Sequence, residues 1–73
     1  MRLCERCRSS IKDSSGNTIA NRLHRAGELC TEERGHEALI ILQDIISALE
    51  TNGGCKDCVF MMKFFKIKTE SLI

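Results

Sequence analysis

A mostly α-helical, helix-turn-helix-like single domain spanning residues 1–73 is predicted by three features of the sequence. Apolar side chains recur at helical spacing in segments 18–26 and 32–51. Two Cys-x-x-Cys motifs, Cys4–Cys7 and Cys55–Cys58, lie near the two ends of the chain. A chain of this length buries a small core, and with 3 Phe, no Trp and no Tyr it needs a further staple.

The four paired cysteines indicate a structural zinc site. Four thiolates complete a tetrahedral shell around zinc and leave no position for a water molecule. We therefore predict a single structural Zn²⁺ ion and no metal catalysis, with these metal ligands: Cys4, Cys7, Cys55 and Cys58. Zinc ribbons usually separate such motifs by about 15–20 residues. The longer separation here makes the helical segments an insertion between two knuckles that the metal joins.

Disulfide, redox and iron–sulfur roles are the alternatives to zinc binding by these cysteines. A disulfide scaffold would leave one of the 5 cysteines unpaired, and Met1–Cys4 has no apolar signal segment. A redox Cys-x-x-Cys usually opens a helix within a βαβ pattern, which the sequence lacks. An iron–sulfur cluster is also bound by four thiolates, so it remains an alternative to zinc. The fifth cysteine, Cys30, is expected to be a small buried side chain.

The first helix is expected at about 18–26, after a polar loop at 13–17. Asn17 or Thr18 is suited to cap it by accepting a hydrogen bond from a first-turn N–H group. Its apolar side chains share one face: Ile19, Leu23 and Ala26. Gly27 is expected to end this helix in a left-handed conformation.

The longest helix is expected at about 32–51. Thr31 is suited to cap it, and Glu32 and Glu33 would then lie at the positive end of the helix dipole. Its core-facing stripe is broad: Ala38, Leu39, Ile41, Leu42, Ile45, Ile46, Ala48 and Leu49. The helix is expected to stop at Asn52–Gly54, where two glycines allow a tight turn into the second cysteine motif.

A further helix is expected to start on the second motif after Cys58. Segment 65–68 alternates between apolar and basic side chains and is expected to be extended, while residues 69–73 are expected to fray. The apolar side chains of this part exceed what a small core buries: Met61, Met62, Phe64 and Phe65. Some of them are expected to form a partner-facing patch flanked by lysines.

Charge is unevenly distributed, although the formal net charge is only +1. Residues 1–27 carry six basic and two acidic side chains, whereas residues 28–58 carry two basic and seven acidic ones. This distribution suits a protein partner at least as well as a nucleic acid. A recognition helix beginning with Glu32 and Glu33 would also repel phosphates. A zinc-stapled, helix-turn-helix-like DNA-binding regulator is therefore the alternative function, and direct DNA contact is less expected.

No catalytic constellation is found in the sequence, so the protein is not expected to be an enzyme. His24 and His36 lie among charged residues at helix edges and are not expected to be metal ligands. A nucleophile pair of Cys30 and His36 would lack both an orienting third group and an oxyanion loop. The longest apolar run, Ala38–Leu42, is too short to span a bilayer, so no membrane association is expected.

The chain resembles the small RNA polymerase-binding transcription regulators of lytic Xanthomonas phages. The resemblance rests on the length of 73 residues, the two cysteine motifs and a helical insertion ending at Asn52–Gly54. It implies a phage protein that binds the N-terminal part of the β′ subunit of bacterial host RNA polymerase. Such a protein weakens σ-factor association, inhibits initiation and promotes antitermination in the host cytoplasm. The zinc role carries over to the four paired cysteines, no partner-binding residue does, and a monomer is expected.

Overall fold

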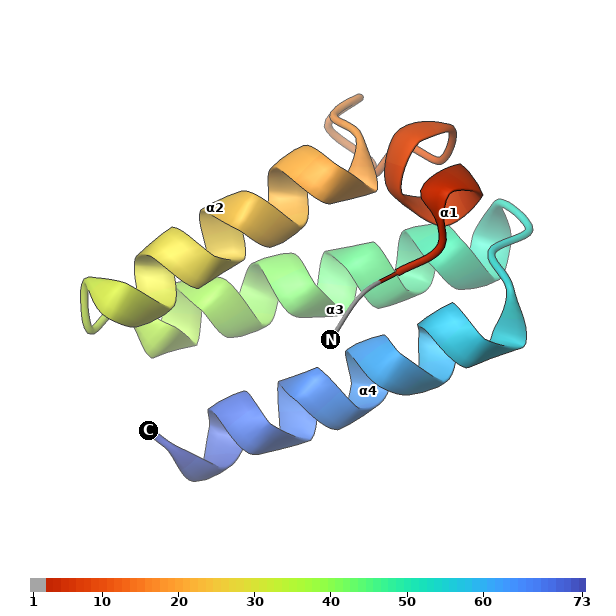
Figure 1. Ribbon diagram of the computed structural model, residues 1–73. Coiled ribbons are helices and arrows are strands. Elements are labelled where there is room, and N and C mark those ends of the chain that lie inside the picture. Colours follow the sequence, from red (N-terminus) through yellow and green to blue (C-terminus); the bar gives the residue numbers. More distant parts are fainter. Residues whose placement is uncertain (1–2) are drawn as a thin grey trace.

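The computed structural model describes residues 3–73 and contains four helices: α1 (Glu5–Ser9), α2 (Ile19–Thr31), α3 (Gly35–Thr51) and α4 (Lys56–Ser71). Helix α3 lies at the centre, α2 and α4 pack against it, and the short α1 lies near the start of α4 (Figure 1). Within the described residues there is no strand, only an isolated bridge between Lys12 and Thr18. The mostly α-helical class is therefore confirmed.

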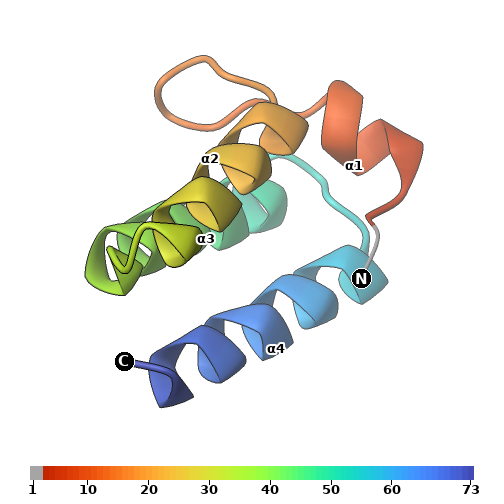
Figure 2. The same cartoon turned by 60° about the vertical axis from the view of Figure 1, so that its left-hand side comes forward.

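Helix α3 forms the main wall of the core, as its broad apolar stripe predicts. Its buried side chains are Ala38, Ile41, Leu42, Ile45, Ile46, Ala48 and Leu49. The stripe is wide because both α2 and α4 pack against α3, and the oblique view of Figure 2 shows these two helices lying apart from each other. Ile40 lies outside the stripe and is 70% exposed.

Helix α2 is longer than predicted. Thr18 caps it as expected, because its hydroxyl oxygen accepts a hydrogen bond of 3.3 Å from the backbone N–H of Asn21. The expected end at Gly27 is wrong, since the helix continues to Thr31 and buries Leu29 in the core. Burial of Leu29, two residues further on, outweighs the low helix propensity of one glycine.

The turn between α2 and α3 also differs from the prediction. Thr31 belongs to the last turn of α2, and its hydroxyl donates to the carbonyl oxygen of Glu28 at 2.8 Å, so it does not cap α3. Glu33 adopts a left-handed φ of 61°, and the N–H of Arg34 donates to the Leu29 carbonyl at 2.8 Å. These bonds satisfy the terminal carbonyls of α2 and reverse the chain, so α2 and α3 form a helical hairpin.

Helix α4 is continuous from Lys56 to Ser71, so the extended conformation expected for residues 65–68 is wrong. Met62 and Thr69, seven residues apart, are both buried, which requires helical spacing across the intervening segment. Packing against α3 therefore overrides a short alternation of apolar and basic residues. The fraying expected for residues 69–73 concerns motion and stays a prediction.

The loop before α2 is organised around one buried carboxylate. Asp13 is 7% exposed, and its Oδ1 atom accepts hydrogen bonds from the N–H groups of Ser15 and Asn17, each at 3.0 Å, and from the Ser15 hydroxyl at 2.7 Å. Its Oδ2 atom faces the guanidinium of Arg22 on α2. Sequence reasoning identified this segment as a polar loop and missed its anchoring role.

Candidate metal centre

Each cysteine motif begins one helix of the structure. Cys4 and Cys55 are the residues before α1 and α4 and share an extended backbone, with φ/ψ of −67°/156° and −74°/152°. Cys7 and Cys58 follow as the third residues of these helices. A spacing of three residues at a helix start places both sulfurs on the same side of the first turn. Two such helix starts can therefore offer four converging sulfurs.

The structure brings the four cysteines of the two motifs together. All four Sγ atoms lie within 4.8 Å of one another. The Sγ atom of Cys55 lies 3.8 Å from those of both Cys4 and Cys7. A tetrahedral thiolate site with metal–sulfur bonds of about 2.3 Å has sulfur–sulfur edges of about 3.8 Å. The cluster therefore fits a metal ion, and all four thiols are free of disulfides.

Two backbone hydrogen bonds cross between the motifs. The N–H of Cys4 donates to the Sγ atom of Cys58, and the N–H of Cys55 donates to the Sγ atom of Cys7, both at 3.4 Å. The first cysteine of each motif thus supports the second sulfur of the other, which gives the site an approximate two-fold symmetry. Such outer contacts orient the ligands of a metal and offset thiolate charge.

A side-chain contact reinforces the junction outside the sulfur cluster. The guanidinium of Arg6 on α1 donates to the carbonyl oxygen of Gly53 at 2.7 Å. Gly53 has a φ of 80°, and the following N–H of Gly54 donates to the Leu49 carbonyl at 2.7 Å. The glycine turn therefore closes α3 and at the same time presents a carbonyl to α1.

The thiols differ in acidity. The pKa of Cys4 is lowered to about 7, chiefly because the backbone N–H of Cys7 favours the thiolate form. Burial raises the pKa of Cys58 to about 12 and also raises the pKa of Cys7. Metal binding to these sulfurs must displace their protons, so loading of the site is expected to depend on pH. Four sulfur ligands around a tetrahedral ion would leave no coordination position for a water molecule.

The other candidate ligands stand apart from this cluster. His24 is exposed on α2 and lies 3.8 Å from the carboxylate of Glu28, and His36 is exposed in the first turn of α3. Cys30 is half-buried and packs against the apolar core. Within residues 3–73, the four paired cysteines are the group of potential ligands that converges.

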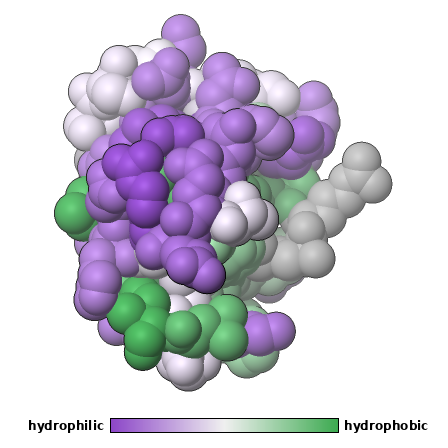
Figure 3. Space-filling model, turned by 90° about the vertical axis from the view of Figure 1, so that its left-hand side faces the viewer, coloured by the Kyte–Doolittle hydropathy of each residue, from purple (hydrophilic) through white to green (hydrophobic). Residues whose placement is uncertain are grey.

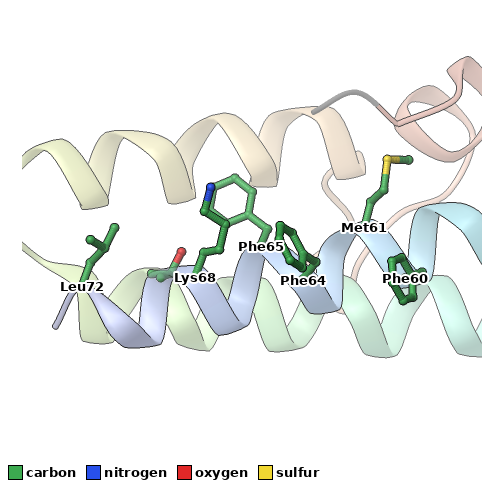
Figure 4. Close-up of a pocket in the computed structure, with 7 residues that line it drawn as sticks. Phe60, Met61, Phe64, Phe65, Lys68 and Leu72 are labelled. Carbon is green, nitrogen blue, oxygen red and sulfur yellow. The ribbon is translucent and has the colours of Figure 1, made fainter.

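A second feature is the apolar surface of α4. The large apolar side chains that are more than half exposed here are Phe60, Phe64 and Ile67 on α4 and Leu72 at its C-terminal cap. A groove of about 510 Å³ runs along the same helix, and its lining side chains appear in Figure 4. The sequence predicted a patch among Met61, Met62, Phe64 and Phe65, of which Phe64 is exposed and Met62 is fully buried. It missed Phe60, and it missed Ile67 and Leu72 because the segment that carries them was not expected to be helical.

No family model matches the chain, and neither a curated protein nor a solved structure is significantly similar to it. Within the described residues, no helix is both long and apolar enough to cross a membrane. The fold and the cysteine cluster define a small helical domain in which the N-terminal segment and the start of α4 meet at a potential metal centre.

Proposed function

We propose that this protein is a phage-encoded transcription regulator that binds bacterial host RNA polymerase through the N-terminal part of the β′ subunit. Binding there weakens σ-factor association, inhibits initiation and promotes antitermination. The observation that supports a binding role is the exposed aromatic face of α4, with Phe60 71% and Phe64 56% exposed. The choice of polymerase as partner comes from the resemblance to the phage regulator called p-seven.

The exposed aromatic surface of α4 is unfavourable in water, which favours a protein partner. A monomeric domain rarely keeps a contiguous strip of large apolar side chains in water unless another surface covers it. Figure 3 shows hydrophobic atoms along the lower edge of one face, at the level of α4, below a mostly hydrophilic surface. Aromatic side chains, phenylalanine included, are enriched in the buried centres of protein interfaces.

The metal supports this role by holding α4 in place. We propose zinc, because four sulfurs that lie within 4.8 Å of one another, with two separations of 3.8 Å, suit a closed tetrahedral site without redox chemistry. Elemental analysis of the purified protein is expected to give one zinc per chain. Stoichiometric iron with visible absorption would instead establish an iron centre, and acid-labile sulfide in the same sample would identify it as an iron–sulfur cluster.

Retention of purified bacterial RNA polymerase on the immobilised, zinc-loaded protein tests the proposed partner. We expect the polymerase to be retained and σ-dependent transcription from a promoter template to fall. The variant Phe64→Ser should lose both effects, whereas Ile40→Ser, a change at an exposed apolar residue on α3, should keep them. Unchanged transcription together with no retention would exclude this function. Salt-sensitive binding to duplex DNA in the same preparation would favour the DNA-binding alternative.

A further inference from the structure

The groove on α4 lies between two parallel rows of side chains. The outer row is Phe60, Phe64, Lys68 and Leu72, and the inner row is Met61, Phe65 and Thr69. Within each row the residues are four apart, so both rows follow the same ridge direction of an α-helix. Figure 4 shows the groove-lining side chains standing along one helix. A channel between two such ridges is the surface feature into which a ridge of another helix packs.

The two rows differ in burial, which gives the groove a floor and an outer wall. Thr69 is buried and Met61 and Phe65 are half-buried against the core, whereas Phe64 is 56% exposed. The inner row is therefore held rigidly by the domain. From Phe60 to Leu72 the groove spans twelve residue steps, or about 18 Å, which accommodates a helix of about three turns.

The charges on α4 indicate which kind of molecule the groove binds. Helix α4 carries four lysines and two acidic residues. Lys63 and Lys66 pair with Glu50 and Glu70 at 3.4 and 3.9 Å. Lys68, which lines the groove, has no acidic partner among the described residues and lies 5.8 Å from the centroid of the Phe64 ring. Among residues 3–73, no acidic side chain lines the groove.

We propose that this groove binds an amphipathic helix of a partner protein whose apolar stripe is bordered by acidic side chains. Apolar residues of that helix pack between the two rows, and a carboxylate on its border pairs with Lys68. The inference rests on the proposed function as a protein-binding module and specifies the part of the partner that α4 contacts.

A second copy of the chain is a poorer occupant than an acidic helix. In a symmetric dimer through this groove, each α4 would face an identical helix with the same excess of two positive charges. Like charges across an interface oppose association. In such a dimer, Lys68 of each copy would still lack a carboxylate partner from the groove of the other copy. Charge complementarity therefore favours a different, acidic chain.

A synthetic helical peptide provides the direct probe of the groove. The peptide has about 16 residues, with leucines at i, i+3, i+4 and i+7 and glutamates on both borders. Calorimetry and amide chemical shifts of the full-length, zinc-loaded protein report its binding. We expect micromolar affinity, with shifts concentrated on α4. A matched peptide with lysines in place of the glutamates should bind at least about tenfold more weakly.

Two pairs of variants separate apolar from electrostatic contacts. Phe64→Ser should weaken peptide binding by about tenfold or more, while Ile40→Ser on α3 should leave it unchanged. Lys68→Glu should weaken binding at least about threefold, while Lys12→Glu, an exposed lysine in the N-terminal loop, should not. Both groove positions are exposed, and circular dichroism verifies that each variant keeps its helix content.

Equal binding of the acidic and basic peptides would overturn the proposal, as would no binding of either. Dimerisation that Phe64→Ser abolishes would assign the groove to a second copy of the chain. Binding to vesicles of anionic phospholipid in preference to the acidic peptide would assign it to a membrane surface. Polymerase retained equally by wild type and Phe64→Ser would reject the groove but keep the proposed function. Peptide binding without polymerase retention would support the groove as a helix-binding site and reject the proposed function.

Discussion

Asp13 connects the N-terminal loop to the helical hairpin through one carboxylate. One oxygen collects donors from Ser15 and Asn17, and the other faces the Arg22 guanidinium, whose side chain is only 23% exposed. Burial would raise the pKa of this carboxyl, but the hydrogen bonds from Ser15 and Asn17 and the charge of Arg22 together lower it. The ionised form is therefore the one that stabilises the fold.

Replacing this carboxylate tests its contribution. Asp13→Asn keeps the side-chain size but removes the buried charge that faces Arg22, which then retains only the more distant Asp44 carboxylate at 4.0 Å. The free energy of unfolding should therefore fall by about 1–3 kcal/mol. The folded-state pKa lies below the ordinary 3.8, so the stabilisation is present above about pH 4 and lost as pH falls through the folded value. Urea titrations at pH 6 and 8 should give equal differences from wild type.

The exposed pair of Glu50 and Lys63 provides the control, because Glu50→Gln should change stability by less than about 0.5 kcal/mol. An Asp13→Asn protein as stable as Glu50→Gln would show that the buried pair contributes nothing.

At the scale of elements, the centre of each helix was easier to predict than its ends. The stripe on α3 identified the core wall because its periodicity extends over many residues. The end of α2 was missed because Glu33, with a φ of 61°, adopts a left-handed conformation that sequence patterns associate with glycine. The extended segment expected at 65–68 was wrong because its alternation is too short to compete with burial of Met62 and Thr69.

Two glycines in different elements should respond oppositely to alanine. Gly27 lies inside α2 with open space around its Cβ position, so Gly27→Ala should stabilise the protein by about 0.5–1 kcal/mol. Gly53 has a φ of 80°, so Gly53→Ala should destabilise it by about 1–2 kcal/mol although it meets no steric clash. Denaturant unfolding of the metal-loaded variants measures both. Equal effects at the two positions would contradict this assignment of backbone conformation.

At the scale of the whole molecule, the cysteine cluster joins parts of the chain that share few other contacts. Helix α1 is only five residues long, too short to be stable alone. Several contacts link α1 to the start of α4 and to the glycine turn between α3 and α4. They include the sulfur cluster, the crossed N–H···S bonds and the contact of Arg6 with Gly53. The sequence predicted the four ligands from their spacing alone. It offered no pattern for the crossed bonds, which depend on how two helix starts meet in space.

Removal of the metal should therefore loosen the N-terminal end before the helical hairpin. A chelator is expected to abolish amide protection in α1 and the first turn of α4, while the packing of α2 on α3 persists longest. Acidification should have the same effect, because protons compete with the metal for Cys7 and Cys58, whose pKa values are raised by burial. Hydrogen exchange recorded with and without chelator measures this loss of amide protection. Uniform loss of protection across all four helices would instead indicate one cooperative unit.

The contribution of the clip to the whole fold is tested by comparing two cysteine substitutions. Cys55 has two sulfur neighbours at 3.8 Å and donates an N–H to Cys7, whereas Cys30 is half-buried beside the core and outside the cluster. Cys55→Ser should leave three sulfurs, release the metal and reduce stability by several kcal/mol, of the order found when metal-coupled folding is lost. Cys30→Ala removes only a small packed thiol and should cost about 1 kcal/mol or less while retaining one metal per chain. Native mass spectrometry counts the metal and thermal unfolding measures stability on the same samples. A Cys55→Ser protein that keeps stoichiometric metal and wild-type stability would show that the N-terminal segment and the start of α4 stay together without a four-cysteine clip.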